Sequence, residues 1–157
     1  MHNFSESLQE FCDIWKEWRL VKDSNSETYA KMTRLVEVEH GEIRVLDVHI
    51  VYSLTYKWPV LWFSLSKRDG TTANSSEVEN LIKSCTSKTG KAVAPIISLN
   101  EHPHLGVLYY NIHPCGTNPE IFQNAPAPTD KINEIAQWFS HYGPDIGISI
   151  PCGMFLR

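Results

Sequence analysis

A run of alternating side chains at residues 48–56 constrains the fold of this chain more than any other feature. Period-two alternation of this kind predicts a strand with one apolar face. Trp58-Pro59 interrupts the run, and residues 60–65 then form a near-continuous apolar segment, which indicates a strand buried on both faces. The chain must therefore build a sheet around these two segments. Every second residue of the first segment belongs to the same face of this strand: Val48, Ile50, Tyr52, Leu54 and Tyr56.

Other segments add strands to this sheet. Residues 29–38 are rich in β-forming side chains and precede a predicted hairpin turn at residues 40–42, and residues 107–112 supply a fourth main strand. Residues 96–99 form either a brief strand or an edge segment. The predicted sheet is therefore a four-stranded antiparallel meander.

Three helices complete the predicted fold, which belongs to the α+β class. Apolar residues at spacings of four and three predict an N-terminal helix, and Ser76 with Glu79 has the form of a capping box at the start of a short middle helix. Thr129 is the predicted cap of a C-terminal helix, which Gly143-Pro144 ends, and an extended tail follows. We expect one domain over residues 1–157, with the helices on one side of the sheet. The residues of the N-terminal helix face are Phe4, Leu8, Phe11, Trp15 and Trp18.

Composition and charge exclude several classes of function. The chain has 157 residues and a net charge of −4, and its lysines and arginines do not cluster, so we predict no nucleic-acid partner. The first residues lack the features of a signal peptide, and no apolar run is long enough for stable membrane insertion. The sequence therefore predicts a cytoplasmic protein. Its four cysteines are expected to be reduced thiols, and Cys12 and Cys85 are predicted core residues.

The segment His113-Pro114-Cys115-Gly116-Thr117 follows the fourth main strand directly. Pro114 fixes its own φ and favours an extended conformation at His113, and Gly116 leaves one side of the sulfur open. The thiol of Cys115 is thus held stiffly where an ordered element ends. Taken alone, this pattern is compatible with a nucleophile and with a metal ligand.

The metal interpretation would combine His113 and Cys115 with two further histidines, His102 and His104. Zinc needs about four converging ligands at a recognisable spacing. The His-x-His and His-x-Cys pairs would have to lie on adjacent elements, and Pro103 and Pro114 stiffen both segments. We therefore predict that the site holds no metal and no cofactor.

Four stretches, in order along nearly the whole chain, carry a family resemblance. The sequence is similar there to the autophagy E2-like conjugating enzymes, and specifically to the branch that handles autophagy-related protein twelve. The stretches are residues 15–19 (WKEWR), 54–61 (LTYKWPVL), 101–106 (EHPHLG) leading into 112–118 (IHPCGTN), and 138–144 (WFSHYGP).

The resemblance implies an E2 (ubiquitin-conjugating enzyme)-like fold and a transferase activity that passes through a thioester. Cys115 would accept autophagy-related protein twelve, a ubiquitin-like modifier, from the E1-like autophagy-related protein seven. The modifier would then pass to a lysine of autophagy-related protein five, which this E2 would recognise without a separate ligase.

Other residues near the motif are candidates for supporting roles. Ordinary ubiquitin E2 enzymes carry a His-Pro-Asn motif whose asparagine supports catalysis, whereas here the cysteine follows His-Pro, so another donor must stabilise the oxyanion. The family resemblance implies that Tyr56 lies close to the cysteine, and Asn111 shares the parity of His113 in the strand. His113 either assists the thiol or shapes the loop through hydrogen bonds. The candidate oxyanion donors are Tyr56, Asn111, Thr117, Asn118 and the backbone N–H groups of Gly116 and Thr117.

Alternative interpretations remain for the supporting residues, for the branch of the family and for the activity itself. Tyr56 is otherwise an amphipathic strand-end aromatic residue, and Asn111 is otherwise a strand-end residue that faces solvent. The chain is otherwise the sister E2-like enzyme that conjugates the lipid-linked modifier, although that enzyme usually carries long acidic insertions. A third alternative is an inactive E2-like binding module, against which the intact Cys115 argues.

Overall fold

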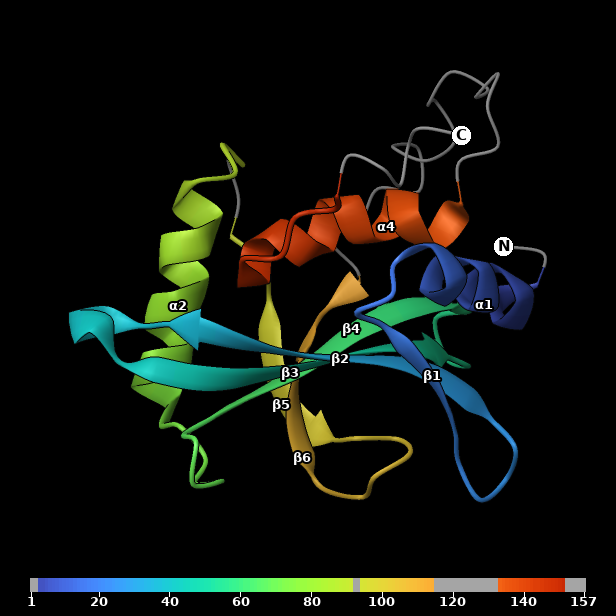
Figure 1. Ribbon diagram of the computed structural model, residues 1–157, viewed down its shortest axis with the longest axis horizontal. Helices are drawn as coiled ribbons and strands as arrows, with labels where there is room; N and C mark the ends of the chain where they lie inside the picture. Colours follow the sequence, from blue (N-terminus) through green and yellow to red (C-terminus); the bar gives the residue numbers. More distant parts are fainter. Residues whose placement is uncertain (1–2, 92–93, 115–132, 152–157) are drawn as a thin grey trace.

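A six-stranded antiparallel sheet forms the centre of the fold, and three α-helices lie on one of its faces (Figure 1). The computed structural model describes residues 3–91, 94–114 and 133–151. The elements are α1 (Phe4–Ile14), β1 (Arg19–Lys22), β2 (Thr28–Glu37), the 3₁₀ helix η1 (Glu39–Gly41), β3 (Ile43–Ser53), β4 (Trp58–Ser66), α2 (Ser75–Ser87), β5 (Ile97–Glu101), β6 (Leu108–Ile112), α4 (Glu134–Tyr142) and the 3₁₀ helix η3 (Gly143–Ile146).

The α+β class is confirmed, but the prediction of four strands is wrong. The strand order is β1-β2-β3-β4-β6-β5, so the four predicted strands occupy consecutive central positions, β2-β3-β4-β6. The short strand β1 was missed because its four residues, Arg19–Lys22, begin and end with a cation and show no apolar alternation. β5 is the outermost strand beside β6, which matches the edge segment expected at residues 96–99.

The N-terminal helix is shorter than the apolar spacing predicts. It ends at Ile14, and Trp15 caps it with an extended backbone. Trp15 and Trp18 nevertheless reach the core, because a turn in which the Trp18 N–H donates to the Trp15 carbonyl preserves their spacing. Their rings pack edge-to-face on Phe139 of α4, with centroids 5.6 and 5.3 Å away.

Asparagines, rather than the predicted residues, cap the two later helices. The Asn74 side chain accepts the Glu77 N–H at the start of α2, so Ser76 is not the cap. At the start of α4 the Asn133 side chain accepts two backbone N–H groups and also donates to the Ser7 carbonyl of α1 at 2.8 Å. This asparagine therefore caps one helix and ties it to another. Thr129 lies outside the described residues.

Gly143 ends α4 as predicted and allows a close packing that no other residue permits. A 3₁₀ turn follows it, so Ile146 belongs to a turn rather than to the expected extended tail. Ile146 and Ile148 are both fully buried. A Cβ at position 143 would lie 2.3 Å from the Phe139 ring and 2.6 Å from the Ile148 carbonyl oxygen. The absence of a side chain here lets the chain after α4 fold back onto the core.

We expect Gly143→Ala to destabilise the protein by about 2 kcal/mol, since the added methyl group must displace a ring and a backbone carbonyl. Urea unfolding measures this change, and Ser84→Ala on the exposed face of α2 serves as the control. Equal midpoints for the two variants would contradict the packing argument.

Candidate functional site

The strand β6 leads directly into His113 and Pro114, the two described residues of the His113–Thr117 motif, at one end of the sheet. β6 lies between β4 and β5, and its Trp62↔Asn111 and Phe63↔Tyr110 pairs with β4 fix its position. The His113 N–H donates to the Ile96 carbonyl at 2.8 Å, which extends the β5 pairing by one bond. Cys115, Gly116, Thr117 and Asn118 lie outside the described residues, so the site is described here through its neighbours.

Tyr56 and His113 lie together at this end of the sheet. The Tyr56 hydroxyl and His113 Nε2 are 3.1 Å apart, and the two rings meet nearly edge-to-face. Tyr56 comes from the β3–β4 turn, where its N–H donates to Ser53 Oγ and Lys57 takes a left-handed backbone. Half of the Tyr56 side chain is exposed. The backbone hydrogen bond of His113 and the contact of its ring with Tyr56 therefore both fix this residue. This favours the interpretation in which His113 shapes the loop.

Asn111 is not the solvent-facing strand-end residue of the alternative interpretation. It is buried rather than exposed to solvent. Its amide nitrogen donates to Asn100 Oδ1 at 2.8 Å and to the Ser98 carbonyl at 3.3 Å, both on β5. The amide hydrogens of Asn111 are thus used within the sheet, and Asn100 and Ser98 are contacts that the sequence analysis did not identify.

A groove of about 580 Å³ begins at these residues and crosses the face of the sheet that the helices do not cover. Val60, Trp62, Glu27 and His104 are among its lining residues. The described residues next to the motif that line this groove are Tyr56, Asn111, His113 and Pro114. The described part of the candidate site therefore borders this groove.

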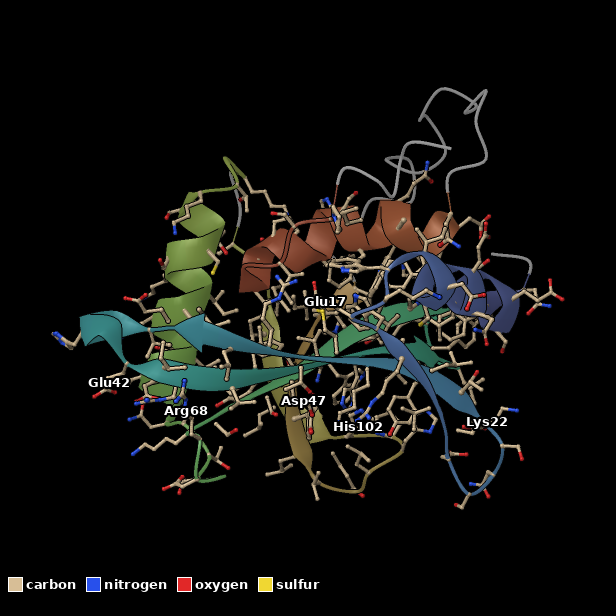
Figure 2. The ribbon with its side chains drawn as sticks, in the orientation of Figure 1. Glu17, Lys22, Glu42, Asp47, Arg68 and His102 are labelled. Carbon is tan, nitrogen blue, oxygen red and sulfur yellow. The ribbon has the colours of Figure 1, made fainter. Side chains whose placement is uncertain are left out.

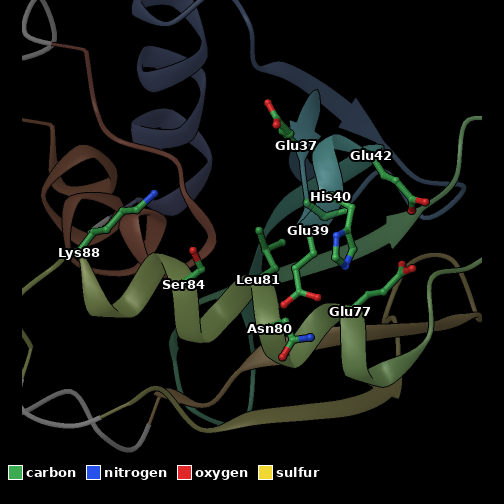
Figure 3. Close-up of a pocket in the computed structure, with 10 residues that line it drawn as sticks. Glu37, Glu39, His40, Glu42, Glu77, Asn80, Leu81, Ser84 and Lys88 are labelled. Atoms are coloured by element: carbon green, nitrogen blue, oxygen red, sulfur yellow. The ribbon is translucent and has the colours of Figure 1, made fainter.

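A second concavity, of about 550 Å³, lies between the β2–β3 connection and α2 (Figure 3). Its walls carry four glutamates, and Arg44 pairs with two of them, Glu42 and Glu77. None of its lining residues belongs to the candidate site. The residues labelled in Figure 3 are Glu37, Glu39, His40, Glu42, Glu77, Asn80, Leu81, Ser84 and Lys88.

The described histidines of the zinc interpretation do not converge. His102 Nε2 lies 2.8 Å from His49 Nδ1, and His102 Nδ1 accepts the backbone N–H of His104. The His104 ring turns instead to Asp23, with 2.7 Å between Nδ1 and Oδ2. His113 contacts Tyr56. The three histidines that were grouped with Cys115 therefore make separate contacts.

His49 and His102 belong to a buried polar chain on the uncovered face (Figure 2, where Asp47 and His102 are labelled). Because His102 Nδ1 accepts a backbone N–H, the hydrogen-bond pattern assigns the ring hydrogen to Nε2, which donates to His49 Nδ1. His49 Nε2 then donates to Asp47, which also accepts the Tyr109 hydroxyl at 2.7 Å. Burial, followed by the neighbouring histidines, lowers the pKa of His102 to about 3, so this imidazole is neutral near neutral pH.

The two cysteines that the structure describes fit the core role predicted for them. Cys12 is buried in α1, and burial, with a smaller effect of Asp13, raises the pKa of its thiol to about 12. Burial also raises the pKa of Cys85, which lies partly buried in α2. Neither thiol is suited to act as a nucleophile near neutral pH.

Comparison with known proteins identifies the family. Residues 19–152 match the family described as "Autophagocytosis associated protein, active-site domain". The chain belongs to this family. Membership confirms the resemblance found in the sequence, and the matched range contains the whole His113–Thr117 motif.

Three curated relatives share the name "Ubiquitin-like-conjugating enzyme ATG10". The human protein is 29% identical over 115 residues, which cover 71% of this chain and 52% of the human protein. The Arabidopsis thaliana protein is 30% identical over 129 residues, or 78% of this chain and 57% of its own length. The Dictyostelium discoideum protein is 30% identical over 122 residues, which cover 69% of this chain and 53% of that protein. This chain thus matches about half the length of each relative. Among the described residues, no helix combines the length and apolar character needed to cross a membrane.

The Asp47 carboxyl generates a prediction about acid stability. Although burial alone would raise its pKa, the hydrogen bond and electrostatic attraction of His49, followed by the Tyr109 hydrogen bond and the Lys31 charge, lower it to about 2 from an ordinary 3.8. The unfolded chain therefore binds a proton at a higher pH than the folded protein does, and stability falls as the pH drops from about 4 to about 2.

We expect Asp47→Asn to remove this contribution, so that the variant loses on the order of 2 kcal/mol less stability than the wild type across that pH range. Denaturant unfolding at a series of pH values tests it, with Asp13→Asn at an exposed position of α1 as the control. The explanation is wrong if Asp47→Asn and Asp13→Asn show the same pH dependence.

Proposed function

We propose that this protein is an E2-like conjugating enzyme of autophagy in which Cys115 carries a ubiquitin-like modifier as a thioester. One observation carries the proposal: within a member of this family, the His-Pro-Cys motif directly follows β6, and Tyr56 is hydrogen-bonded to the motif's histidine at 3.1 Å. The elevated pKa values of Cys12 and Cys85 also argue against those thiols as carriers.

The proposed reaction has two steps that balance without a cofactor. In the first, the Cys115 thiolate attacks the carbonyl of the modifier's C-terminal glycine, and the cysteine of the E1-like enzyme leaves as a thiolate. In the second, a neutral lysine amine attacks the new thioester, an isopeptide bond forms, the Cys115 sulfur leaves as a thiolate, and the amine proton passes to solvent or to that thiolate. An ordinary cysteine, with a pKa of about 8.5, is only a few per cent thiolate at neutral pH, so partner docking is the natural point of activation.

Both steps pass through a tetrahedral intermediate whose negative oxygen needs hydrogen-bond donors. Asn111 uses its amide hydrogens on β5, so its side chain would have to leave Asn100 and Ser98 before it could contribute. The proposed donors are therefore the exposed Tyr56 hydroxyl and the backbone N–H groups of Gly116 and Thr117. His113 acts as a support that holds the Tyr56 ring beside the motif.

The proposed partners follow from the family resemblance. Autophagy-related protein seven would supply the modifier, autophagy-related protein twelve would be the modifier, and autophagy-related protein five would provide the acceptor lysine. The shared name ATG10 of the three curated relatives supports this branch over the sister enzyme for the lipid-linked modifier. To distinguish the branches, both modifiers are incubated with the E1-like enzyme and ATP, and the modifier that becomes attached to this protein is identified.

A charging assay tests the proposed role of Cys115. With E1-like enzyme, ATP and modifier, the wild type and Cys85→Ala should form an adduct that reducing agent removes, and Cys115→Ala should form none. Cys115→Ser should form an ester that resists reducing agent, if its hydroxyl is acylated. Gels run without and with reducing agent report the adduct of all four proteins. An adduct of undiminished intensity on Cys115→Ala would refute the proposed thioester.

The Tyr56 hydroxyl is tested by separating the two steps. We expect Tyr56→Phe to accept the modifier normally but to discharge it to the acceptor lysine about 10- to 100-fold more slowly, since it lacks a donor used in the second transition state. Single-turnover discharge of purified thioester measures this, and Tyr52→Phe on β3 is the matched control. Equal discharge rates for wild type and Tyr56→Phe would leave Tyr56 a purely structural residue.

A further inference from the structure

We propose that Asp23, Glu27 and His104 form a binding site for a divalent transition-metal ion of the zinc class. These residues come from two turns that are distant in sequence: residues 23–27 join β1 to β2, and residues 102–107 join β5 to β6. One ligand atom from each residue lies within 4.8 Å of the others. The three residues are called the turn site below. It shares His104 with the four-ligand set considered in the sequence analysis, but its other two ligands are carboxylates, and it does not depend on the proposed conjugating activity.

The atom positions are close to those that a tetrahedral ion requires. With metal–nitrogen and metal–oxygen distances of about 2.0–2.2 Å, two ligands of such an ion lie roughly 3.3 Å apart. His104 Nδ1 is 2.7 Å from Asp23 Oδ2 and 3.9 Å from Glu27 Oε2. One distance must open and the other must close by about half an ångström, which side-chain rotation can supply. Three protein ligands would leave a fourth position for water.

Contacts outside the turn site already hold two of the ligands in place. The N–H groups of Asn25 and Glu27 both donate to Asp23 Oδ1, which leaves Oδ2 directed at His104. The His104 ring stacks on Tyr29, with centroids 4.8 Å apart and planes 16° apart. Supporting contacts of this kind orient ligands in metal sites and reduce the ordering that binding requires.

Burial and charge also suit a cation. The side chains of His104 and Asp23 are only 7% and 13% exposed, whereas Glu27 is 62% exposed and free to move inward. Two carboxylates and a neutral imidazole carry a charge of about −2. Among the described residues, the ion pairs of Asp23 and Glu27 are with His104 alone. A metal ion would take the place of the hydrogen between His104 Nδ1 and Asp23 Oδ2, and the neutral imidazole would then carry its hydrogen on Nε2.

An ion bound there would join the β1–β2 turn to the β5–β6 turn. Glu27 and His104 also line the groove that reaches Tyr56 and Pro114. The bound ion would therefore fix two of the residues that line that groove, and none of its three ligands is a residue of the His113–Thr117 motif. The predicted direct effect is a gain in stability rather than a gain in catalysis.

The experiment uses the full chain with Cys115→Ser and Cys152→Ser, so that thiols in the parts of the chain not described here do not compete for metal. Co²⁺ is titrated and followed by visible absorption, and Zn²⁺ is titrated by calorimetry. We expect one equivalent of each ion to bind. Zinc at about 100 times its dissociation constant should raise the melting temperature by about 5 °C or more.

Variants assign the binding to the turn site. Glu27→Gln, an exposed substitution that should not disturb folding, is expected to weaken binding at least tenfold, and His104→Asn to abolish it. His40→Asn in η1 is the matched control, since it also replaces a histidine but lies in another part of the molecule, and it should bind like its parent. Absence of saturable one-to-one binding, or equal affinity in Glu27→Gln, His104→Asn and the parent, would overturn the proposal.

Discussion

The pairing of β6 with β4 is the interaction on which the candidate site depends. Only two residue pairs define it, yet they set the point at which the chain leaves the sheet and enters the His113-Pro114-Cys115 motif. β5 then pairs with β6 over five residues, and the Ile96 carbonyl takes the His113 N–H beyond the end of the strand. With the β3–β4 turn at the same end of the sheet, the Tyr56 hydroxyl reaches the motif. A change in β6 register by one residue would reverse the faces of Asn111 and Ile112 and separate the motif from its neighbours.

The two faces of the sheet are packed in different ways. The covered face packs against α1, α2 and α4 in one apolar core, which includes the aromatic contacts of Trp15 and Trp18 with α4. On the other face, none of the described helices covers the sheet, and a polar chain from Asp47 through His49 to His102 is buried there. Each ring nitrogen of these two histidines has a hydrogen-bond partner, so the chain avoids the cost of unsatisfied buried groups. This polar packing holds the β5–β6 turn against the sheet and leaves the groove beside the motif open.

Sequence reasoning predicted those parts of the fold that periodicity determines. The central strands and the apolar helix faces follow from residue spacing, as does the end of α4 at Gly143. Spacing cannot distinguish a helix from a turn that reproduces the same interval, so Trp18 was assigned to α1 although it follows the helix. At the candidate site, the proximity of Tyr56 to Cys115 stays a prediction from the family stretch, and the contact that the structure describes is with His113. The engagement of Asn111 by Asn100 was not predictable, because it depends on strand register across β5 and β6, which no local pattern encodes.

The Tyr56–His113 hydrogen bond has a consequence for the order of events in the proposed reaction. A phenol has one hydrogen, so a hydroxyl that donates to His113 Nε2 cannot donate at the same moment to an oxyanion. For Tyr56 to stabilise the tetrahedral intermediate, it must either exchange this partner or accept its hydrogen bond from the imidazole. In the second case His113 carries its hydrogen on Nε2, which leaves the phenolic hydrogen available to the reacting group. The histidine of the motif would then contribute to transfer through its tautomer, with the Cys115 sulfur as the leaving group, and not by removing a proton from the thiol.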